Sequence, residues 1–290
     1  MSRSFKAYAL IFPGFFVSAL IILWPLITLV QLSMAQVNRF GQIKGFAGLQ
    51  NYLVVFQDPL LYASLLRTLV WTGGVVGGTL LLSLPVALLM HQRFYGRGLA
   101  RVLIMLPWAI SLAMLALVGR WMLNGESGMV NSALSYFGLI HGNIAWLGQA
   151  STAFPAQILI GIVASYPFTV SVYLGGLSSV PTELYEAARL EGSSPLQTFW
   201  RITVPLLKPF INIAVVLNTI YVFNSFPIIW ATTEGGPANS TDILVTYLYK
   251  LAFRFGKVGE AAVLSLVMFL VLLAFTLIYL RISSTERRAS

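Results

Sequence analysis

YEAARLEGSSPLQTFWRITVPLLKP, residues Tyr185–Pro209, is the longest charged interruption between apolar segments in the second half of this chain. Just before it, Pro181 suits the first turn of a helix. Glu183 and Glu186 would then lie near the positive end of that helix's dipole. Gly192 can adopt the positive φ that commonly ends a helix. The order of these residues predicts a short helix that stops at a sharp glycine bend.

A second helix is predicted directly after the bend. Ser194, Pro195 and Gln197 supply an N-cap hydroxyl, a proline at the first helical position and the glutamine of a capping box. Pro205 and Pro209 are expected to end this second helix. Residues 181–209, hereafter the 181–209 loop, are therefore expected to form two short helices joined at a rigid bend. Because apolar segments flank the loop, it would project from a membrane surface.

The composition excludes an ordinary soluble domain. Of the 290 residues, 58% are hydrophobic and 9% are charged, and the mean hydropathy is +0.82, values typical of a polytopic membrane protein. The net charge is +9, but the basic residues cluster at the ends of apolar segments. They do not interleave with aromatic residues along a polar groove. This pattern favours membrane topology and anionic headgroups over nucleic-acid binding.

The sequence lacks the motifs of an enzyme or a metal site. It contains no cysteine, and its two histidines, His91 and His141, lie far apart. It has no G-x-x-x-x-G-K-[ST] phosphate loop, no G-x-S-x-G motif and no H-E-x-x-H motif. We therefore expect no catalytic residue, no metal and no cofactor in this chain.

Six apolar segments are each close to the ~20 residues that cross a bilayer. They predict an all-α fold, a polytopic membrane protein with a single transmembrane domain over residues 1–290. The first segment is too long for the apolar region of a signal peptide, so we interpret it as a retained helix bent near Pro25. Residues 33–65 are expected to form a polar loop. The predicted spans are 8–32, 68–90, 102–123, 154–176, 210–230 and 261–280.

The basic residues set the expected orientation. If both termini are cytoplasmic, more than half of the 18 basic residues lie on the inner side, in agreement with the positive-inside rule. This orientation also places the 181–209 loop in the cytoplasm. The inner basic residues are Arg3, Lys6, Arg93, Arg97, Arg101, Arg189, Arg201, Lys208, Arg281, Arg287 and Arg288.

Polar side chains gather inside the fourth and fifth spans, where they are costly unless they face a cavity or a partner. Asn218, Tyr221, Asn224 and Ser225 share much of one helical face of the fifth span. Hydroxyls, amides and aromatic rings suit a neutral polyhydroxyl ligand. The alternative is hydrogen bonding between helices, for which one Asn or Ser would suffice. The repeated asparagines favour a lined cavity.

The 181–209 loop resembles the signature cytoplasmic loop of the membrane subunits of ABC importers. Glu191, Ser193 and Val204 stand where that family more often has Asp, Ala and Leu, which are mild departures. The residues that carry the resemblance are Glu186, Ala187, Ala188, Glu191, Gly192, Phe199, Ile202 and Pro205.

The resemblance implies the permease fold of type I ABC importers. It also implies that the loop contains a coupling helix, which docks in a cleft of an ATP-hydrolysing subunit. The alternative is an amphipathic hairpin at the membrane interface without a docking role. The candidate coupling residues are Glu183, Glu186, Ala187, Ala188, Arg189, Glu191 and Gly192.

Motifs outside the loop resemble carbohydrate-importer permeases related to the maltose and glycerol-phosphate importers. They are GFAGLQNY at 45–52, Tyr166-Pro167, Gly235-Gly236-Pro237, Thr241, Tyr247 and Ala252-Phe253. The resemblance covers nearly the whole chain and implies a heterodimer in the bacterial inner membrane. The implied partners are a second permease, two ATPase subunits that bind ATP and Mg, and an extracytoplasmic solute-binding protein.

In the maltose importer, sugar contacts come from the spans on either side of the coupling loop. Two maltose-site positions, an Asn and a Trp, fall on Gly161 and Val163, which argues against maltose itself as the substrate. The other matched positions are Ser165, Phe168, Asn218, Tyr221 and Val222, and the polar face of the fifth span adds Asn224.

Two arginines, Arg67 and Arg120, are expected at the outer ends of the second and third spans. Their side chains either snorkel to the membrane interface or, for Arg120, attract an acidic sugar or sugar phosphate. Arg120 is therefore a candidate substrate residue.

These observations predict the permease subunit of an ATP-driven, binding-protein-dependent sugar importer that works by alternating access. The alternative is a self-sufficient secondary transporter or channel. That class would require internal repeats or an ionisable residue buried in mid-span, and the sequence contains neither.

Overall fold

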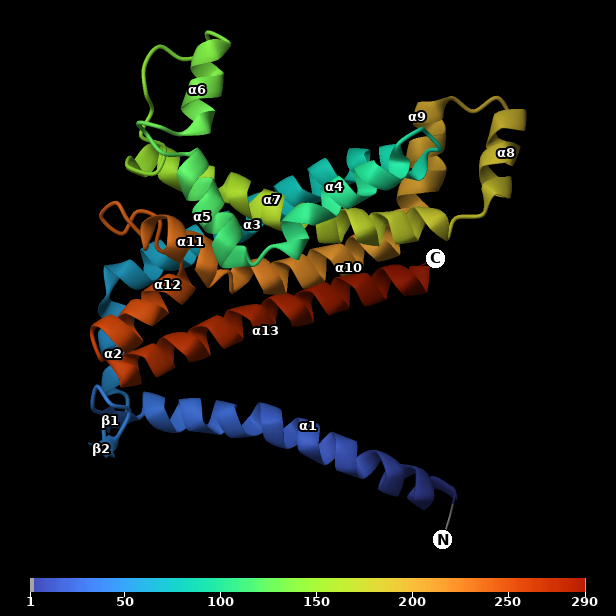
Figure 1. The fold of residues 1–290 in the computed structure, drawn as a ribbon. Helices are drawn as coiled ribbons and strands as arrows, with labels where there is room; N and C mark the ends of the chain where they lie inside the picture. Colours follow the sequence, from blue (N-terminus) through green and yellow to red (C-terminus); the bar gives the residue numbers. More distant parts are fainter. Residues whose placement is uncertain (1–2, 290) are drawn as a thin grey trace. The chain divides into compact units, whose positions relative to one another are not determined.

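The computed structural model describes residues 3–289, with side chains described from Leu10 to Arg281 (Figure 1). Their contacts group the chain into two units. The first contains the residues up to Ala63 together with Tyr247–Phe275. The second contains Ser64–Thr246 and the residues from Thr276 onward. The predicted inner residues Arg3, Lys6, Arg287 and Arg288 have side chains outside the described part.

The helices confirm the predicted class of an all-α, multi-pass membrane protein. Within the described residues, five helices are long and apolar enough to cross a membrane, and a bent pair of shorter helices can supply a sixth span. The five are Leu10–Ser33, Pro59–His91, Ala150–Ser178, Pro195–Phe223 and Val258–Arg281.

In the first unit, the segment predicted as a polar loop at 33–65 is instead structured. Helix α1 (Arg3–Ser33) leads into an antiparallel pair of short strands, β1 (Ala35–Val37) and β2 (Ile43–Phe46), and then into α2 (Gln50–Gln57). Asn51 organises this segment because its amide donates to the carbonyls of Ser33 at 2.9 Å and Ala35 at 3.0 Å. The carbonyls at the end of α1 and at the start of β1 are thereby given a hydrogen-bond donor.

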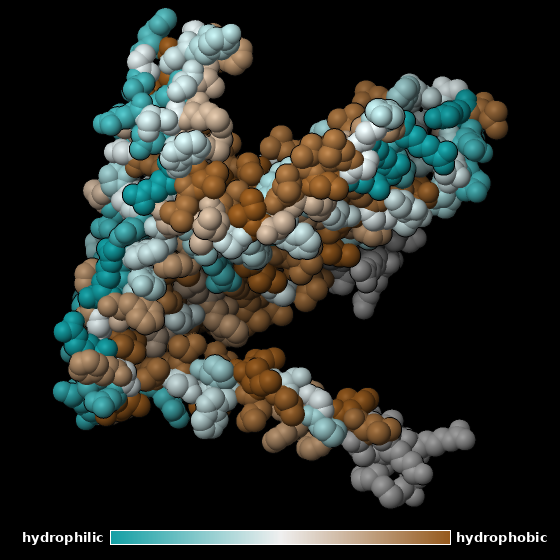
Figure 2. Space-filling view, viewed as in Figure 1, coloured by the Kyte–Doolittle hydropathy of each residue, from teal (hydrophilic) through white to brown (hydrophobic). Residues whose placement is uncertain are grey.

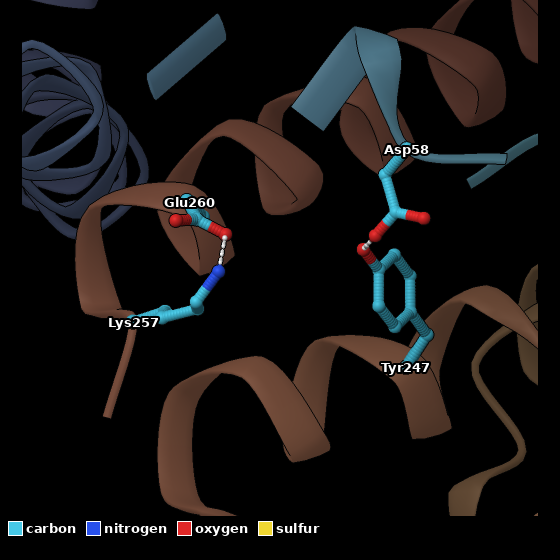
Figure 3. A network of polar contacts seen from close by, with 4 residues as sticks. All are labelled: Asp58, Tyr247, Lys257 and Glu260. Atoms are coloured by element: carbon cyan, nitrogen blue, oxygen red, sulfur yellow. Dashed lines mark hydrogen bonds and ion pairs between the residues drawn. The ribbon is translucent and has the colours of Figure 1, made fainter. Parts of the chain in front are cut away.

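The same unit contains a second polar cluster, shown in Figure 3. Tyr247, in α12 (Leu244–Tyr249), donates its hydroxyl proton to the Asp58 carboxylate, and Lys257 forms an ion pair with Glu260 at 3.1 Å. Burial, first, and then the hydrogen bond to Asp58 and the nearby carboxylates of Asp58 and Glu260 raise the pKa of Tyr247. The π-helix η2 (Lys250–Arg254) and α13 (Val258–Ala289) follow.

Close helix packing in the second unit depends on glycine. Helix α3 (Pro59–His91) lies against α7 (Ala150–Ser178), with Trp71, Val75 and Ile162 in the shared core. A Cβ added at Gly161 would lie 2.7 Å from Cγ2 of Val75, and one at Gly78 would lie 2.4 Å from Cδ1 of Ile162. Small residues therefore allow these two helices to approach closely, as in other membrane bundles.

The third predicted span, 102–123, is not one helix. It consists of α4 (Arg97–Ala109) and α5 (Leu112–Met122), which are bent by 99°. Pro107 weakens the end of α4 because it lacks a backbone N–H. The Ser111 hydroxyl then accepts a hydrogen bond from the Met114 N–H at 3.3 Å, so a new helix starts immediately.

The second helix of the 181–209 loop does not end at Pro205 or Pro209 as predicted. Instead α9 (Pro195–Thr198), the π-helix η1 (Phe199–Thr203) and α10 (Val204–Phe223) form one continuous helix. The N–H of Val204 bonds to the carbonyl of Phe199, so the chain has made a wider turn before Pro205. Pro205 then lies at the start of α10, where its missing N–H costs little.

The fifth predicted span, 210–230, is broken after α10. Asn224 and Ser225 separate α10 from α11 (Phe226–Thr233), which packs against α5 and α7. Two further helices, α6 (Met129–Tyr136) and α8 (Thr182–Leu190), lie at opposite ends of α7 (Figure 1). Between these ends the visible surface of α4 and α7 is mainly hydrophobic, whereas the ends are hydrophilic (Figure 2).

Candidate functional site

The 181–209 loop forms its predicted glycine bend through a Schellman motif at the end of α8. Gly192 has φ +73°, and its N–H donates to the carbonyl of Arg189 at 3.1 Å. The N–H of Ser193 donates to the carbonyl of Ala188 at 2.9 Å. These two bonds satisfy carbonyls that would otherwise be orphaned at the helix end. The direction of the chain after α8 is therefore fixed.

A capping box then starts α9. The Gln197 N–H donates to the Ser194 hydroxyl at 3.3 Å, and the Ser194 N–H donates to the Gln197 side-chain oxygen at 3.0 Å. This reciprocal pair follows the bend within two residues. The loop is consequently a preorganised turn rather than an irregular connection.

The outer surface of this turn mixes charged and apolar side chains. Ala188 is buried, and the Tyr185 hydroxyl lies 3.2 Å from the Thr203 hydroxyl, which ties α8 to η1. In contrast, Leu190 is 90% exposed and Leu196 is 68% exposed. Most of the candidate coupling residues are exposed as well, namely Glu183, Glu186, Ala187, Arg189, Glu191 and Gly192. Large exposed leucines beside charges are typical of a surface that binds another protein.

Three of the candidate substrate residues are buried inside the second unit. Asn218 is 3% exposed, and its amide donates to the Thr169 hydroxyl at 2.9 Å and to the Ala214 carbonyl at 2.8 Å. Ser165 is also buried, and the carbonyl of buried Val222 accepts from the Trp71 indole at 3.0 Å. In this conformation Asn218 therefore forms a hydrogen bond between helices, which was the alternative to lining a cavity.

The other candidate substrate residues remain accessible. Tyr221 is 52% exposed, and Asn224 is exposed at the break between α10 and α11. Phe168 is partly exposed, with its ring centroid 6.3 Å from that of Trp108. Arg120 is exposed and donates to the Ala231 carbonyl of α11 at 3.2 Å. An accessible phenol and amide at a helix break, with a guanidinium farther along α11, can all donate hydrogen bonds to a polar solute.

Sequence reasoning missed a buried polar network that joins α7 to the last residues of α11 and to the loop that follows. Gln157, fully buried, donates to the hydroxyls of Thr232 at 2.7 Å and Thr233 at 2.9 Å. Thr233 also lies 2.7 Å from Thr241, whose hydroxyl donates to the Gly236 carbonyl at 2.8 Å. A lone glutamine within an apolar span was the signal that could have indicated this contact.

Arg67, which was expected to extend to the membrane interface, is hydrogen-bonded to another segment of the chain. Its Nε donates to the Asp242 carbonyl at 2.8 Å, and Asp242 itself is fully buried. Asp242 also accepts from the Thr246 hydroxyl at 2.9 Å. Arg67 therefore helps to hold the residues that follow the Gly235-Gly236-Pro237 turn.

A cavity of about 450 Å³ lies between α5, α6 and α7. Apart from Ser151 and Thr152, its lining is apolar and includes Leu159 and Val163. A polyhydroxyl ligand would lose its hydrogen bonds to water there without replacement. The accessible polar residues around the Asn224 break suit such a ligand better.

Apolar spans with a preorganised, exposed loop between two of them define a multi-pass membrane protein. The chain belongs to the family of binding-protein-dependent transport system inner membrane components, whose sequence profile matches residues 79–287. The family resemblance predicted from the 181–209 loop is thereby confirmed.

Individual relatives match over nearly the whole chain. A probable ABC transporter permease protein of Brucella suis is 58% identical over 282 residues, which cover 97% of this chain and 98% of the relative. The sulfoquinovosyl glycerol transport system permease protein of Agrobacterium fabrum is 33% identical over 281 residues, covering 97% and 91%. The fold is similar to a crystal structure of a bacterial ABC transporter involved in the import of the acidic polysaccharide alginate. That similarity has a TM-score of 0.82 at 24% identity and covers 98% of this chain and 96% of the other.

Proposed function

We propose that this chain is the permease subunit of an ATP-driven importer for a sugar or sugar derivative. It works with a second, homologous permease, two ATPase subunits and an extracytoplasmic solute-binding protein. Both of its termini lie in the cytoplasm. The observation that carries the proposal is the 181–209 loop, a rigid bend with exposed carboxylates and leucines between two spans.

The proposed coupling step relies on the stiffness of that bend. When the ATPase subunits close, they push on α8, and the Schellman and capping-box bonds prevent the bend from absorbing the motion. Tyr185 transmits the movement to η1 and α10, and α7 receives it directly from α8. The two spans then switch the transport pathway between its two accessible states.

The substrate class is supported by the side chains at the helix break. Tyr221 and Asn224 offer an aromatic ring, a hydroxyl and an amide, the groups that suit a sugar. Ser165, Asn218 and Val222 are buried in the same unit, and Phe168 is partly exposed. The relative in Agrobacterium fabrum, named for sulfoquinovosyl glycerol, is consistent with a sugar-derived substrate.

Arg120 extends the proposal to anionic sugars. Its guanidinium donates to the Ala231 carbonyl of α11, the helix that begins directly after the Asn224–Ser225 break. Its guanidinium can bind a carboxylate or phosphate through two parallel hydrogen bonds. If uptake of galacturonate were the same in cells with Arg120→Ala as in wild-type cells, this extension would be wrong.

The energy source of the importer is a separate subunit. The chain has no phosphate-binding loop, so ATP and Mg are bound by the partner ATPase subunits. This chain contributes no catalytic residue to ATP hydrolysis. Its role is to bind the ATPase and to form the pathway.

The test compares the same substitution at two glycines with similar geometry. Gly192 has φ +73° and Gly138 has φ +68°, and a Cβ added at either would meet no heavy atom within 4 Å. Gly192→Asp adds charge and backbone strain to the proposed docking surface, whereas Gly138→Asp makes the same change in the turn that ends α6. We expect Gly192→Asp to insert normally but to lose both the co-purified ATPase subunit and transport.

Gly138→Asp should keep the ATPase subunit bound. Equal recovery of the ATPase with both variants would contradict the proposed docking surface. A wild-type chain that transports sugar in vesicles without any nucleotide-binding subunit would instead favour a self-sufficient transporter.

A further inference from the structure

Helix α4 combines basic residues with an apolar groove along one face. No residue of α4 is buried, although the helix contains Leu99, Val102, Leu103 and Leu106, all about half or more exposed. A groove of about 320 Å³ runs along the helix and is lined by Arg101, Val102, Met105, Leu106 and Ala109. A cation at one end of an apolar groove is the complement of a ligand with an anionic head and an apolar tail.

Among the residues with described side chains, neither arginine at this end forms an ion pair with a carboxylate. Arg97 and Arg101 lie one turn apart on the same side of α4. Arg101 donates through Nη2 to the Met90 carbonyl at 3.3 Å. The buried Nε atoms of both arginines have no hydrogen-bond partner among the described residues. The sequence has no Asp or Glu between Asp58 and Glu126, so no carboxylate close in sequence is available to these two arginines.

We propose that this groove binds an anionic phospholipid. The phosphate of the lipid accepts two hydrogen bonds from the Arg101 guanidinium, and Arg97 adds a second positive charge. One acyl chain lies along Val102, Met105, Leu106 and Ala109. From Arg101 to Ala109 the helix rises about 12 Å, close to half of the ~30 Å hydrocarbon thickness of a bilayer.

The neighbouring residues favour a lipid over free phosphate. Phe94 is 43% exposed and Tyr95 is fully exposed, directly before α4, where aromatic rings suit the headgroup level. The chain thus presents aromatic rings, guanidinium groups and an apolar groove in that order. Free phosphate would use the arginines and leave the groove empty. The site requires only that the chain spans a membrane, and the proposed topology places it in the inner leaflet.

A bound acyl chain would also stabilise the contact between α4 and α7. Met105 lines the groove, and its sulfur accepts a hydrogen bond from the Ser171 hydroxyl of α7 at 3.6 Å. Trp108, on the next turn of α4, has its ring 6.3 Å from that of Phe168. Lipid packed on Met105 would therefore restrict the movement of α4 on α7.

The test measures binding of single lipids to the purified full chain in detergent by native mass spectrometry. Phosphatidylglycerol and phosphatidylcholine with identical acyl chains are titrated against wild type, Arg101→Gln and Arg93→Gln. Arg93 is the matched control because it is an exposed arginine of the same basic segment that does not line the groove. We expect wild type and Arg93→Gln to bind phosphatidylglycerol about tenfold more tightly than Arg101→Gln does. The reason is that charge-assisted hydrogen bonds to the phosphate are lost only in Arg101→Gln.

A second variant tests the groove itself. Leu106→Trp, at a half-exposed position, should fill the groove and weaken phosphatidylglycerol binding about fivefold. Its thermal unfolding midpoint should match that of wild type. Equal losses in Arg101→Gln and Arg93→Gln would indicate diffuse attraction to basic residues and overturn the proposal. Displacement of the lipid by equimolar inorganic phosphate, or equal affinity for both lipids, would overturn it too.

Discussion

The glycine in the 181–209 loop and the glycine between α3 and α7 are needed for different reasons. Gly192 has φ +73°, and a Cβ added there would meet no atom within 4 Å. Gly161 has no positive φ, but a Cβ added there would lie 2.7 Å from Val75 and 3.0 Å from the Trp71 ring. The loop glycine sets the direction of the backbone, whereas the bundle glycine makes room for a neighbouring helix.

Polar side chains in the loop and in the bundle also serve different purposes. In the loop, Glu183, Glu186 and Arg189 are exposed and thus available to a partner. In the bundle, Gln157 and Asn218 are almost fully buried and are bonded to threonines of other segments. Polar residues of the loop can therefore serve recognition, while most of those in the bundle hold helices in register.

The strongest test of this comparison places the same large residue at both glycines. Gly161→Leu would force α3 and α7 apart, and overpacking of this kind costs about 1–3 kcal/mol or more. We expect poor yield and a clearly lower thermal unfolding midpoint in detergent. Gly192→Leu adds only the strain of a left-handed conformation, about 1–2 kcal/mol, confined to the end of α8.

Gly73→Leu is the matched control for the bundle, because a Cβ at Gly73 would meet nothing within 4 Å. Its unfolding midpoint should equal that of wild type. If Gly161→Leu were as stable as Gly73→Leu, the close packing of α3 on α7 would not be what requires glycine at position 161.

The 181–209 loop could be predicted from sequence because local rules determine it. Gly192 ends α8, and Ser194, Pro195 and Gln197 start α9, each through bonds that span only a few residues. Prediction failed at Pro205 in the same loop. A π turn just before this proline lets the helix continue, and no short-range sequence pattern announces such a turn.

The bundle was harder to predict because its contacts join residues far apart in sequence. The position of each span followed from hydropathy, but the breaks at Ser111 and at Asn224–Ser225 did not. Ser111 is an ordinary serine until the chain bends and its hydroxyl caps α5. Likewise, the polar face of the fifth span predicted a cavity. In the structure the Asn218 amide instead donates a hydrogen bond to the Thr169 hydroxyl of α7.

A double-mutant cycle sharpens the comparison within the bundle. Asn218→Ala and Thr169→Val each remove one partner of the 2.9 Å hydrogen bond between α10 and α7. We expect a coupling free energy of about 0.6 kcal/mol, the usual size for side-chain hydrogen bonds within membrane bundles. The measurement is the free energy of unfolding of the two single variants and the double variant in mixed micelles. A coupling energy of zero would contradict a stabilising role for the hydrogen bond between Asn218 and Thr169.

The smallest expected effect concerns the buried phenol of the first unit and appears only at alkaline pH. Burial and the Asp58 hydrogen bond raise the pKa of Tyr247 above its usual value of about 10, so the folded state favours the neutral phenol. Its contribution is complete below pH ~10 and declines as the pH rises further, because the unfolded chain then loses the proton first. Above pH ~10 the stability of Tyr247→Phe should therefore fall less than that of wild type. Between pH ~7 and ~9 the curves of unfolding midpoint against pH should run parallel for the two proteins.

Unfolding midpoints measured from pH ~7 to above pH ~10 test this difference. Tyr95→Phe, at a fully exposed tyrosine, is the control and should follow wild type. Parallel curves throughout would mean that the Tyr247–Asp58 pair is solvated, unlike the buried pairs of the bundle.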